Sequence, residues 1–392
     1  MNNIRKTIAI DIRLLGRKRT GDEMVFFHLT KEVLKIDRHN QYRLLTDETD
    51  TEKLRGLAVR LECLGQHNVE IVSLPSNNRF AWNLFTLPRY LFFHQIDVLH
   101  TQYILPFLIP RRTKIALHIH DVSFRAYPEL IGWSDRFFLA LLIGRSLRRA
   151  TCIIAPSSFT KDEIIAYYSI RADKIAVVPN AIGEEFLRVA PLTEQDTVRL
   201  REKYHLPEHF ILSLGTLQPR KNIPFLIGAF AKLEERFRTT PATGAPLTLV
   251  LVGNRNAHHT DTAIDRSIAE HHIENAVVFT GFIDHDDLPS VIRLADIFVF
   301  PSLYEGFGIP LLEAMSQGVA VAASDIPSLR SVADDGALYF DPTNIANCEE
   351  KLYTLFIDSE QKKRLIQRGY NRLRFFSWEK SARLLRDIYT KL

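Results

Sequence analysis

The sequence predicts an α/β protein with two doubly wound, Rossmann-like domains. Short apolar runs rich in β-branched residues alternate with longer amphipathic stretches along the chain. These runs form two series, and 392 residues suit two domains at the usual size of roughly 100–200 residues each. Alternation of strand and helix favours parallel sheets that helices cover on both faces.

Each apolar run is interpreted as a buried strand. In the first series the expected strands are residues 7–12, 42–45, 69–74, 98–100, 114–118, 152–155 and 175–178. In the second series they are residues 210–214, 247–252, 277–280, 297–300, 319–323 and 337–340. Amphipathic helices are expected between most of them. We therefore expect an N-terminal domain over residues 1–190, a C-terminal domain over residues 191–375 and a last helix at 376–392.

Composition argues against several classes of protein. The three cysteines, Cys63, Cys152 and Cys348, are too few and too scattered for a disulfide scaffold or a zinc cluster, which favours a reducing, cytoplasmic compartment. No apolar run approaches the roughly 18 residues of a membrane span, and the N-terminus does not have the pattern of a secretory signal. Residues 1–190 hold 27 Lys and Arg against 20 Asp and Glu, a net charge of +7, whereas residues 191–392 hold 23 against 26, a net charge of −3. This asymmetry indicates different partners for the two halves.

The segment after the expected strand at 297–300 is the most informative, because ligands of open α/β sheets bind at the carboxyl ends of strands. Glu305 follows this strand, Gly308 lets the backbone approach a ligand closely, and Pro310 suits the first turn of a helix. Glu313 then lies about one turn into that helix. The backbone amides at 307–309 and the positive helix end form an anion site, and carboxylates beside it are suited to sugar hydroxyls. The alternative is that both carboxylates complement the helix dipole, which is plausible for Glu305 taken alone.

A second candidate segment follows the expected strand at 210–214. Gly215 allows a turn, and Arg220 and Lys221 then place two cations at the strand end. Cations in this position can hold a diphosphate. The alternative is a solvated basic turn.

Two more strand ends, in the N-terminal half, carry polar residues. His120 and Asp121 follow the strand at 114–118, where they could hydrogen-bond a sugar hydroxyl or shuttle a proton, although a lone His is more often structural. The strand at 7–12 is followed by a basic loop and then by Gly21, Asp22 and Glu23, which open a helix. Asp22 is expected to cap that helix.

Together these segments resemble the retaining glycosyltransferases of family 4. That family has the GT-B fold, in which two Rossmann-like domains face each other across a cleft. The most specific match is the E-x7-E element from Glu305 to Glu313, and the stretch 120–129 resembles bacterial mannosyltransferases of polysaccharide and O-antigen assembly. The helix at 376–392 resembles the closing helix of the family, which crosses back onto the N-terminal domain. Further matches, spread over nearly the whole chain, are residues 156–158, 178–180, 215–222, 252–253 and 280–282.

The resemblance implies a role for each candidate residue. Lys221 and Arg220 neutralise the donor diphosphate, so neither a metal nor another cofactor is expected. Glu313 binds the ribose hydroxyls, and Glu305 holds the donor sugar together with the amides of Phe307 and Gly308. The catalytic group is then His120, Arg220, Lys221 and Glu305. The other expected contacts are Gly215, Gly253, Phe282, Ile283 and Ile309 on the donor side, and Gly21 and Asp121 on the acceptor and phosphate side.

The chain departs from the family pattern at several positions, and two of the departures concern loops of the candidate site. Many members carry Arg directly after the glycine that corresponds to Gly215, whereas this chain has Thr216, and Arg220 is taken as its substitute. The first loop of the family has two glycines followed by an aromatic residue, whereas this chain has the more acidic sequence Gly-Asp-Glu-Met at 21–24. The second phosphate-binding cation and the acceptor side therefore rest on weaker matches than the E-x7-E element.

The resemblance implies transfer of a hexose with retention, in the first place mannose from GDP-mannose, onto a saccharide acceptor in surface polysaccharide synthesis. A UDP-hexose is the alternative donor, and nucleic acid is not an expected partner. We expect a lipid-diphosphate-linked acceptor at the cytoplasmic face of a membrane, because basic residues stand beside aromatic and aliphatic ones at 89–94 and 133–149. The alternative is that residues 137–143 belong to the core with the arginines on the solvent face, and a soluble acceptor is then favoured.

Other classes of protein fit less well. A Rossmann oxidoreductase should carry G-x-G-x-x-G after its first strand, and residues 11–17 read Asp-Ile-Arg-Leu-Leu-Gly-Arg. A phosphorylase of the same fold would need pyridoxal phosphate and a longer chain. A non-catalytic nucleotide-sugar-binding protein stays open, but the joint presence of Glu305, Glu313, Lys221 and His120 favours an enzyme.

Overall fold

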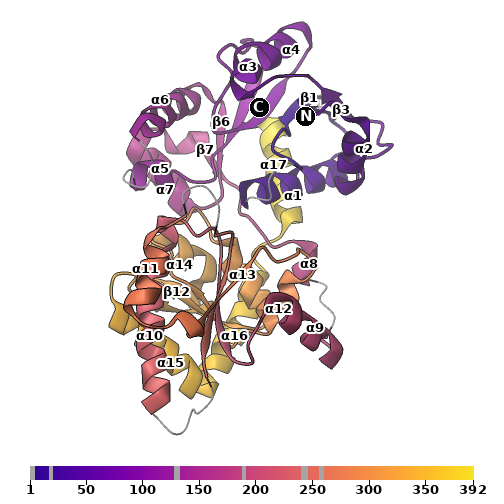
Figure 1. Cartoon of the computed structure of the whole chain (residues 1–392). Coiled ribbons are helices and arrows are strands. Elements are labelled where there is room, and N and C mark those ends of the chain that lie inside the picture. Colours follow the sequence, from indigo (N-terminus) through magenta and orange to yellow (C-terminus); the bar gives the residue numbers. More distant parts are fainter. Residues whose placement is uncertain (1–4, 17–20, 128–132, 188–190, 240–245, 256–259) are drawn as a thin grey trace. The chain divides into compact units, whose positions relative to one another are not determined.

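A computed structural model describes residues 5–16, 21–127, 133–187, 191–239, 246–255 and 260–392, without the side chains of 133–140. The chain divides into two compact units, one of Met1–Ala181 with Phe376–Leu392 and one of Ile182–Phe375. The division thus falls before residue 190, where the boundary was expected, and residues 188–190 lie outside the described ranges. Figure 1 shows the elements of both units.

The described part of the first unit contains a sheet of seven parallel strands in the order β3-β2-β1-β4-β5-β6-β7. Its order reverses between β1 and β4, so the loops that follow these two strands meet at the carboxyl edge of the sheet. The strands are β1 (Thr7–Asp11), β2 (Gln41–Thr46), β3 (Val69–Ser73), β4 (Val98–Gln102), β5 (Lys114–His118), β6 (Cys152–Ala155) and β7 (Ile175–Val177).

Helices cover this sheet, and the last one comes from the far end of the chain. Helix α17 packs beside α1, where Trp378 stacks on His28 with ring centroids 5.2 Å apart. Its Tyr389 hydroxyl lies 2.6 Å from Nδ1 of His100 on β4. The helices are α1 (Gly21–Ile36), α2 (Thr51–Arg60), α3 (Arg79–Ala81), the π-helical turn η1 (Trp82–Thr86), α4 (Leu87–Phe93), α5 (Ser123–Ala126), α6 (Trp133–Arg149), α7 (Ser158–Tyr168), η3 (Ala172–Lys174) and α17 (Trp378–Lys391).

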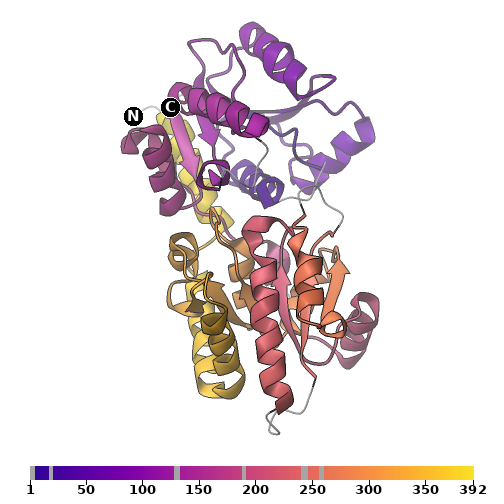
Figure 2. The same cartoon turned by 60° about the vertical axis from the view of Figure 1, so that its left-hand side comes forward.

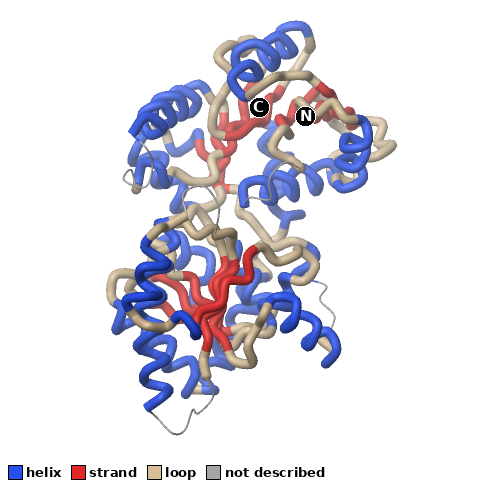
Figure 3. Tube along the Cα trace, viewed as in Figure 1, coloured by secondary structure: helices blue, strands red, loops and turns tan. Residues whose placement is uncertain are grey.

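Within the described residues the second unit holds a sheet of six parallel strands in the order β10-β9-β8-β11-β12-β13. The order reverses here between β8 and β11. The sheet lies between helices on both faces (Figures 2 and 3). The strands are β8 (Phe210–Leu214), β9 (Thr248–Val252), β10 (Val277–Gly281), β11 (Ile297–Phe300), β12 (Ala320–Ser324) and β13 (Ala337–Phe340).

The core of the second unit is formed by strand residues such as Ile297 and Val299 and by helix residues such as Leu226, Phe230 and Leu352. Its helices are α8 (Glu184–Leu187), α9 (Glu194–Tyr204), η4 (Pro219–Lys221), α10 (Ile223–Thr239), α11 (Ala263–Glu270), η6 (Glu274–Ala276), α12 (Leu288–Arg293), α13 (Ile309–Ser316), α14 (Pro327–Ala333), η7 (Asp334–Gly336), α15 (Ile345–Ile357) and α16 (Ser359–Leu373).

The expectation of two doubly wound α/β domains is confirmed. Each apolar run that was interpreted as a strand is a strand, with ends that differ by at most two residues. No helix in the part of the chain that the structure covers is both long and apolar enough to cross a membrane.

Candidate active site

The point at which the strand order of the second unit reverses brings two of the predicted segments together. Lys221 ends the short helix η4 after β8, and Glu305 follows β11, the neighbouring strand. Asn222 adopts a left-handed backbone conformation (φ 58°) directly after Lys221, which ends this turn before α10 begins. Such a reversal of strand order is where doubly wound sheets bind their ligands.

Glu305 forms ion pairs with both predicted cations. Nζ of Lys221 donates to Oε1 of Glu305, and Nη1 of Arg220 donates to Oε2 at 3.1 Å. Lys221 is only 9% exposed and Glu305 only 7%. Burial by itself would raise the pKa of Glu305, but the charges of Lys221 and Arg220 outweigh burial and hold this pKa below its usual value. The carboxylate is therefore ionised, and two cations face one anion.

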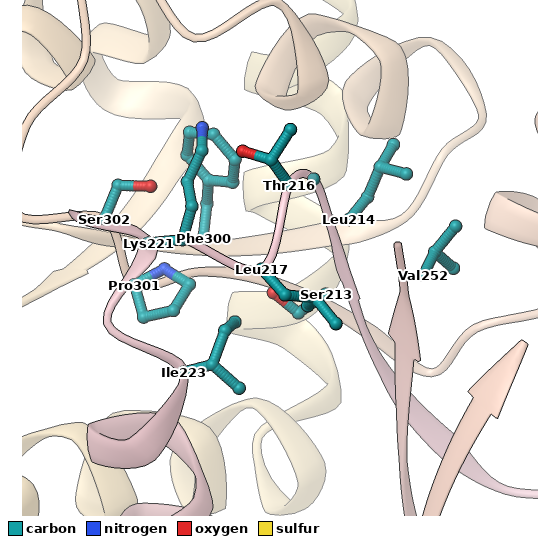
Figure 4. A pocket seen from close by; sticks show the side chains of 11 residues that line it. Ser213, Leu214, Thr216, Leu217, Lys221, Ile223, Val252, Phe300, Pro301 and Ser302 are labelled. Atoms are coloured by element: carbon teal, nitrogen blue, oxygen red, sulfur yellow. The ribbon is translucent and has the colours of Figure 1, made fainter. Parts of the chain in front are cut away.

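A pocket adjoins this ion pair at the carboxyl ends of β8 and β11. Figure 4 shows Lys221 running beside the ring of Phe300, with the hydroxyl of Thr216 directed toward them. Nζ of Lys221 lies 5.0 Å from the centroid of that ring. Thr216 and Ser302 also line the pocket, so hydroxyl groups stand beside the cation. Thr216 occupies the position at which many family members carry Arg.

Two predicted glycines are required by the packing of the loops. Gly215 has φ +153°, and a Cβ at Gly253 would lie 2.3 Å from the carbonyl oxygen of Gly215. Gly308 has φ +96°, and a Cβ there would lie 2.7 Å from a methyl carbon of Leu329. A side chain at Gly253 would push its loop away from the backbone of Gly215, whereas at Gly308 the positive φ disfavours any other residue, because the added Cβ would meet only the movable end of the Leu329 side chain. Donor contacts of Gly215, Gly253 and Gly308 stay predictions.

Helix α13 begins as the sequence predicts, with Gly308 as its N-cap and Pro310 in its first turn. Glu313 lies about one turn further on and is half-buried. Burial and the nearby carboxylate of Glu185 together raise the pKa of Glu313 to about 8, with the charge of His285 acting in the opposite direction. Glu185 is in turn paired with His285, whose Nε2 lies 2.8 Å from Oε1 of Glu185. Neither Glu185 nor His285 was found from the sequence, because no motif links them to Glu313.

The remaining donor-side residues differ in their exposure. Ile283 is buried, whereas the side chain of Phe282 is exposed after the end of β10. Phe307 is buried beside Glu305, and Ile309, the first residue of α13, is partly exposed. If the base lies here, Phe282 is the residue that can offer a side-chain surface to it.

In the first unit, His120 lies in a polar cluster after β5. Its Nε2 lies 2.7 Å from Oε1 of Gln102, and its Nδ1 lies 3.9 Å from Oδ1 of Asp22. The hydroxyl of Tyr103 donates to Oδ2 of Asp22 at 3.2 Å. Asp22 lies inside the first turn of α1, so the expectation that it caps this helix is wrong. Gln102 and Tyr103 were missed because their sequence carries no recognisable motif.

Asp121 and Gly21 have simpler surroundings. Oδ1 of Asp121 accepts hydrogen bonds from the backbone N–H of Ser123 at 3.0 Å and from its hydroxyl at 2.8 Å, which stabilises the turn before α5. Gly21 is exposed at the start of α1, and a Cβ there would meet open space. Among the described residues no cluster of three or more His, Cys, Asp and Glu side chains could hold a metal ion.

Comparison with known proteins matches both halves of the chain. The family described as glycosyl transferases group 1 matches residues 196–372, and the glycosyltransferase family 4 description matches residues 21–186. O-antigen chain mannosyltransferase B of Escherichia coli is 30% identical over 277 residues, which make up 70% of this chain and 69% of that protein. The chain belongs to the family 4 glycosyltransferases. The serotype-specific mannosyltransferase WbdA of Escherichia coli is 32% identical to this glycosyltransferase over 248 residues, which are 62% of the chain but only 29% of WbdA.

Solved structures support the same fold for this family 4 member. A glycosyltransferase from Rickettsia africae superposes with a TM-score of 0.72 at 18% identity, over 99% of this chain and 98% of that one. WaaG, a glycosyltransferase of lipopolysaccharide biosynthesis, gives a TM-score of 0.70 at 16% identity, over 98% and 99% of the two chains. Anabaena Alr3699/HepE in complex with UDP-glucose gives 0.73 at 18% identity, over 99% and 100%. These similarities confirm the expected GT-B class of fold.

Proposed function

We propose that this chain transfers a hexose from a nucleotide-sugar to a saccharide acceptor with retention, and without a metal or other cofactor. The observation that carries the proposal is the cluster of the buried Lys221 and Glu305 with the partly buried Arg220, in which two cations face one carboxylate at the reversal of strand order. The excess positive charge suits the diphosphate of a donor. The pocket beside Lys221 and the first turn of α13 provide further hydrogen-bond donors for it.

In the proposed reaction the bond between the anomeric carbon and the diphosphate breaks as the acceptor oxygen attacks from the same face. Negative charge grows on the leaving diphosphate, and Lys221 and Arg220 stabilise it. Charge stabilisation of this kind is the largest single contribution in many enzymes. The diphosphate in turn takes up the proton of the acceptor hydroxyl. Glu313 binds the ribose hydroxyls of the donor in the same way before and during the reaction.

GDP-mannose is the proposed donor, and a UDP-hexose is the alternative. The first rests on relatives that are named mannosyltransferases, at 30–32% identity. The second rests on the fold neighbour Alr3699/HepE, which was solved with UDP-glucose. We propose that the base of the donor binds at Phe282 and Ile283, after β10.

A lipid-diphosphate-linked acceptor at a membrane surface is the proposed partner of the first unit. Phe80, Phe85, Phe92 and Phe93 are exposed on the segment that runs from α3 to α4, although Tyr90 and Leu91 of the same segment are buried. Residues 71–96 contain Arg79 and Arg89 but no Asp or Glu. Exposed aromatic rings among arginines are typical of surfaces that lie in a lipid interface.

The second segment proposed for the membrane is described only in part. The side chains of 133–140 lie outside the part that the structure describes. Residues 128–129, the end of the stretch that resembles mannosyltransferases, lie outside it as well. In the described end of α6, Leu141 is exposed whereas Ile143 and Leu147 are buried. Ile143 therefore contributes to the core, as the alternative for residues 137–143 expected, whereas Leu141 of the same stretch does not.

A panel of GDP-, UDP- and ADP-sugars tests the proposal. The cognate donor at about 100 times its dissociation constant adds about 2.7 kcal/mol of stability, which a thermal unfolding assay detects. Calorimetry then compares GDP with UDP. Tenfold tighter binding of UDP, about 1.4 kcal/mol, would replace GDP-mannose by a UDP-hexose. NMR of the product reports the anomeric configuration, and inversion would contradict the proposed mechanism.

A further inference from the structure

The sheet of the first unit has its own reversal of strand order, between β1 and β4, and polar side chains meet there. Asp22 lies on α1, the helix that follows β1, and Tyr103 directly follows β4. The hydroxyl of Tyr103 donates to Oδ2 of Asp22 at 3.2 Å, so the two sides of the reversal are joined by a hydrogen bond. This is the position at which doubly wound sheets bind ligands. Lys221 and Glu305 occupy the equivalent position in the second unit.

His120, which follows the neighbouring strand β5, adds a second polar atom to this place. The amide oxygen of Gln102 can only accept, so Nε2 of His120 carries the proton of their 2.7 Å hydrogen bond. In the neutral ring Nδ1 is then an acceptor. The His120 side chain is 5% exposed, and its Nδ1 has no hydrogen-bond partner among the described residues. An acceptor buried in this way needs a donor, because an unmade hydrogen bond destabilises the protein.

Asp22 offers an acceptor beside this nitrogen. Its Oδ1 lies 3.9 Å from Nδ1 of His120, too far for a direct hydrogen bond. The Asp22 side chain is 45% exposed and accessible from solvent, while Tyr103 holds its other oxygen. Two neighbouring acceptors, Oδ1 of the partly exposed Asp22 and the buried Nδ1 of His120, match a ligand that brings two hydrogen-bond donors. A pair of adjacent sugar hydroxyls has this chemistry.

The sequence already predicts that His120 hydrogen-bonds a sugar hydroxyl; we propose that Asp22 extends this contact into a binding site for adjacent hydroxyls of a sugar substrate, and that Tyr103 positions the Asp22 carboxylate. The inference rests on the proposed glycosyltransferase function and extends it, because Asp22 becomes a specificity-determining residue of the first unit. The sugar is part of the acceptor or of the donor, and both present the same hydroxyl chemistry. The acidic first loop, a departure from the family pattern, then has a function in binding.

A purely structural role for Asp22 makes a different prediction. A carboxylate in the first turn of a helix stabilises the helix dipole, so its loss would change the melting temperature and leave substrate binding alone. In a hydroxyl site, Asp22→Asn removes the charge, adds an N–H donor and weakens the binding of one sugar substrate. Loss of a hydrogen bond to a charged group corresponds to a rise in KM of about 10-fold or more.

The test uses steady-state kinetics of the full chain with Asp22→Asn and Tyr103→Phe. Asp50→Ala is the matched control, because Asp50 caps α2 of the same unit by accepting from the backbone N–H of Glu52 at 2.9 Å. We expect Asp50→Ala to lower the melting temperature without changing KM. Asp22→Asn should raise the KM of one sugar substrate with little change in melting temperature. Tyr103→Phe should raise the same KM by a smaller factor.

Donor hydrolysis without acceptor separates the two sources of the sugar. A raised acceptor KM with unchanged hydrolysis assigns the site to the acceptor, and a raised donor KM in both assays assigns it to the donor sugar. If the wild type is active and Asp22→Asn has donor and acceptor KM values within twofold of the wild-type values, the inference about Asp22 is overturned while the proposed function stands. A wild-type chain with no transfer or hydrolysis of any donor in the panel would overturn the proposed function and this inference together.

Discussion

Replacing Glu305 by Gln removes the carboxylate that the buried Lys221 and the partly buried Arg220 share in the candidate active site. The amide has nearly the same shape, so the substitution changes charge with little change in packing. Nη1 of Arg220 and Oε2 of Glu305 are 3.1 Å apart, and Coulomb attraction over that separation is about 5 kcal/mol at an effective dielectric constant of about 20. Lys221, on the other oxygen, adds to this attraction.

The net effect is smaller than this attraction, because the substitution also removes the cost of burying the carboxylate. Breaking a buried pair by removing one partner destabilises proteins by about 3–5 kcal/mol. For a unit of this size each kcal/mol lowers the melting temperature by about 2–4 °C, so Glu305→Gln should melt about 6–20 °C below the wild type. A nucleoside diphosphate returns negative charge to Lys221 and Arg220, so it should raise the melting temperature of Glu305→Gln more than that of the wild type.

Thermal unfolding followed by circular dichroism measures both effects. Glu349→Gln is the matched control, because Arg236 pairs with Glu349 at 2.9 Å in the same unit but is 41% exposed. Exposed pairs contribute about 0–1 kcal/mol, so this control should melt within about 4 °C of the wild type. A Glu305→Gln variant that melts no lower than the control would refute the reasoning.

Four further predictions address turnover, donor binding, titration and the membrane. Lys221→Ala should lower turnover by a factor on the order of 100–1,000, as the loss of one oxyanion donor does; near-normal turnover in a steady-state assay would remove Lys221 from the mechanism. Glu313→Gln should raise the donor KM, whereas Glu305→Gln should mainly lower kcat, and the opposite pattern would exchange their roles. Because burial raises the pKa of Glu313 from 4.5 to about 8, the folded state holds this proton more tightly, and the stability it contributes is lost as pH rises from 4.5 to 8. The melting temperature of Glu313→Gln relative to that of the wild type should therefore increase as pH rises from 5 to 9. The same difference in melting temperature at both pH values would contradict the raised pKa of Glu313. Exposed Phe85 and Phe93, both replaced by Ser, should reduce co-sedimentation with anionic vesicles at low salt, and wild-type protein that stays in the supernatant would refute the membrane proposal.

Much of the fold was predictable because parallel strands that helices cover on both faces have continuous apolar sequences. The run 210–214 is a strand with the ends expected from its sequence, and so is 297–300. Helix α13 was also predictable, since Gly308 and Pro310 carry the local conformations that start a helix. Such signals depend on neighbours in the chain, so the sequence contains them.

The candidate active site was predictable where a motif carries it and not elsewhere. Glu305 and Lys221 stand in recognisable segments, but their direct ion pair joins residues 84 positions apart and depends on β8 lying next to β11. Glu185 and His285 carry no local signal, and they become relevant only because the fold places them near Glu313. Gly253 was expected to contact the donor, which stays a prediction, and only the structure shows that a Cβ there would meet the carbonyl oxygen of Gly215.

The sequence by itself determined the two α/β domains, their strands, the family and the residues of the E-x7-E element. Only the tertiary structure decided that Glu305 is the shared counter-ion of Lys221 and Arg220, and that Asp22, Tyr103 and His120 meet at the reversal of strand order in the first sheet. The physical reason is that periodicity and turn chemistry act over a few residues. Burial, charge pairing and the pKa of a side chain are set by neighbours that the strand order brings from distant parts of the chain.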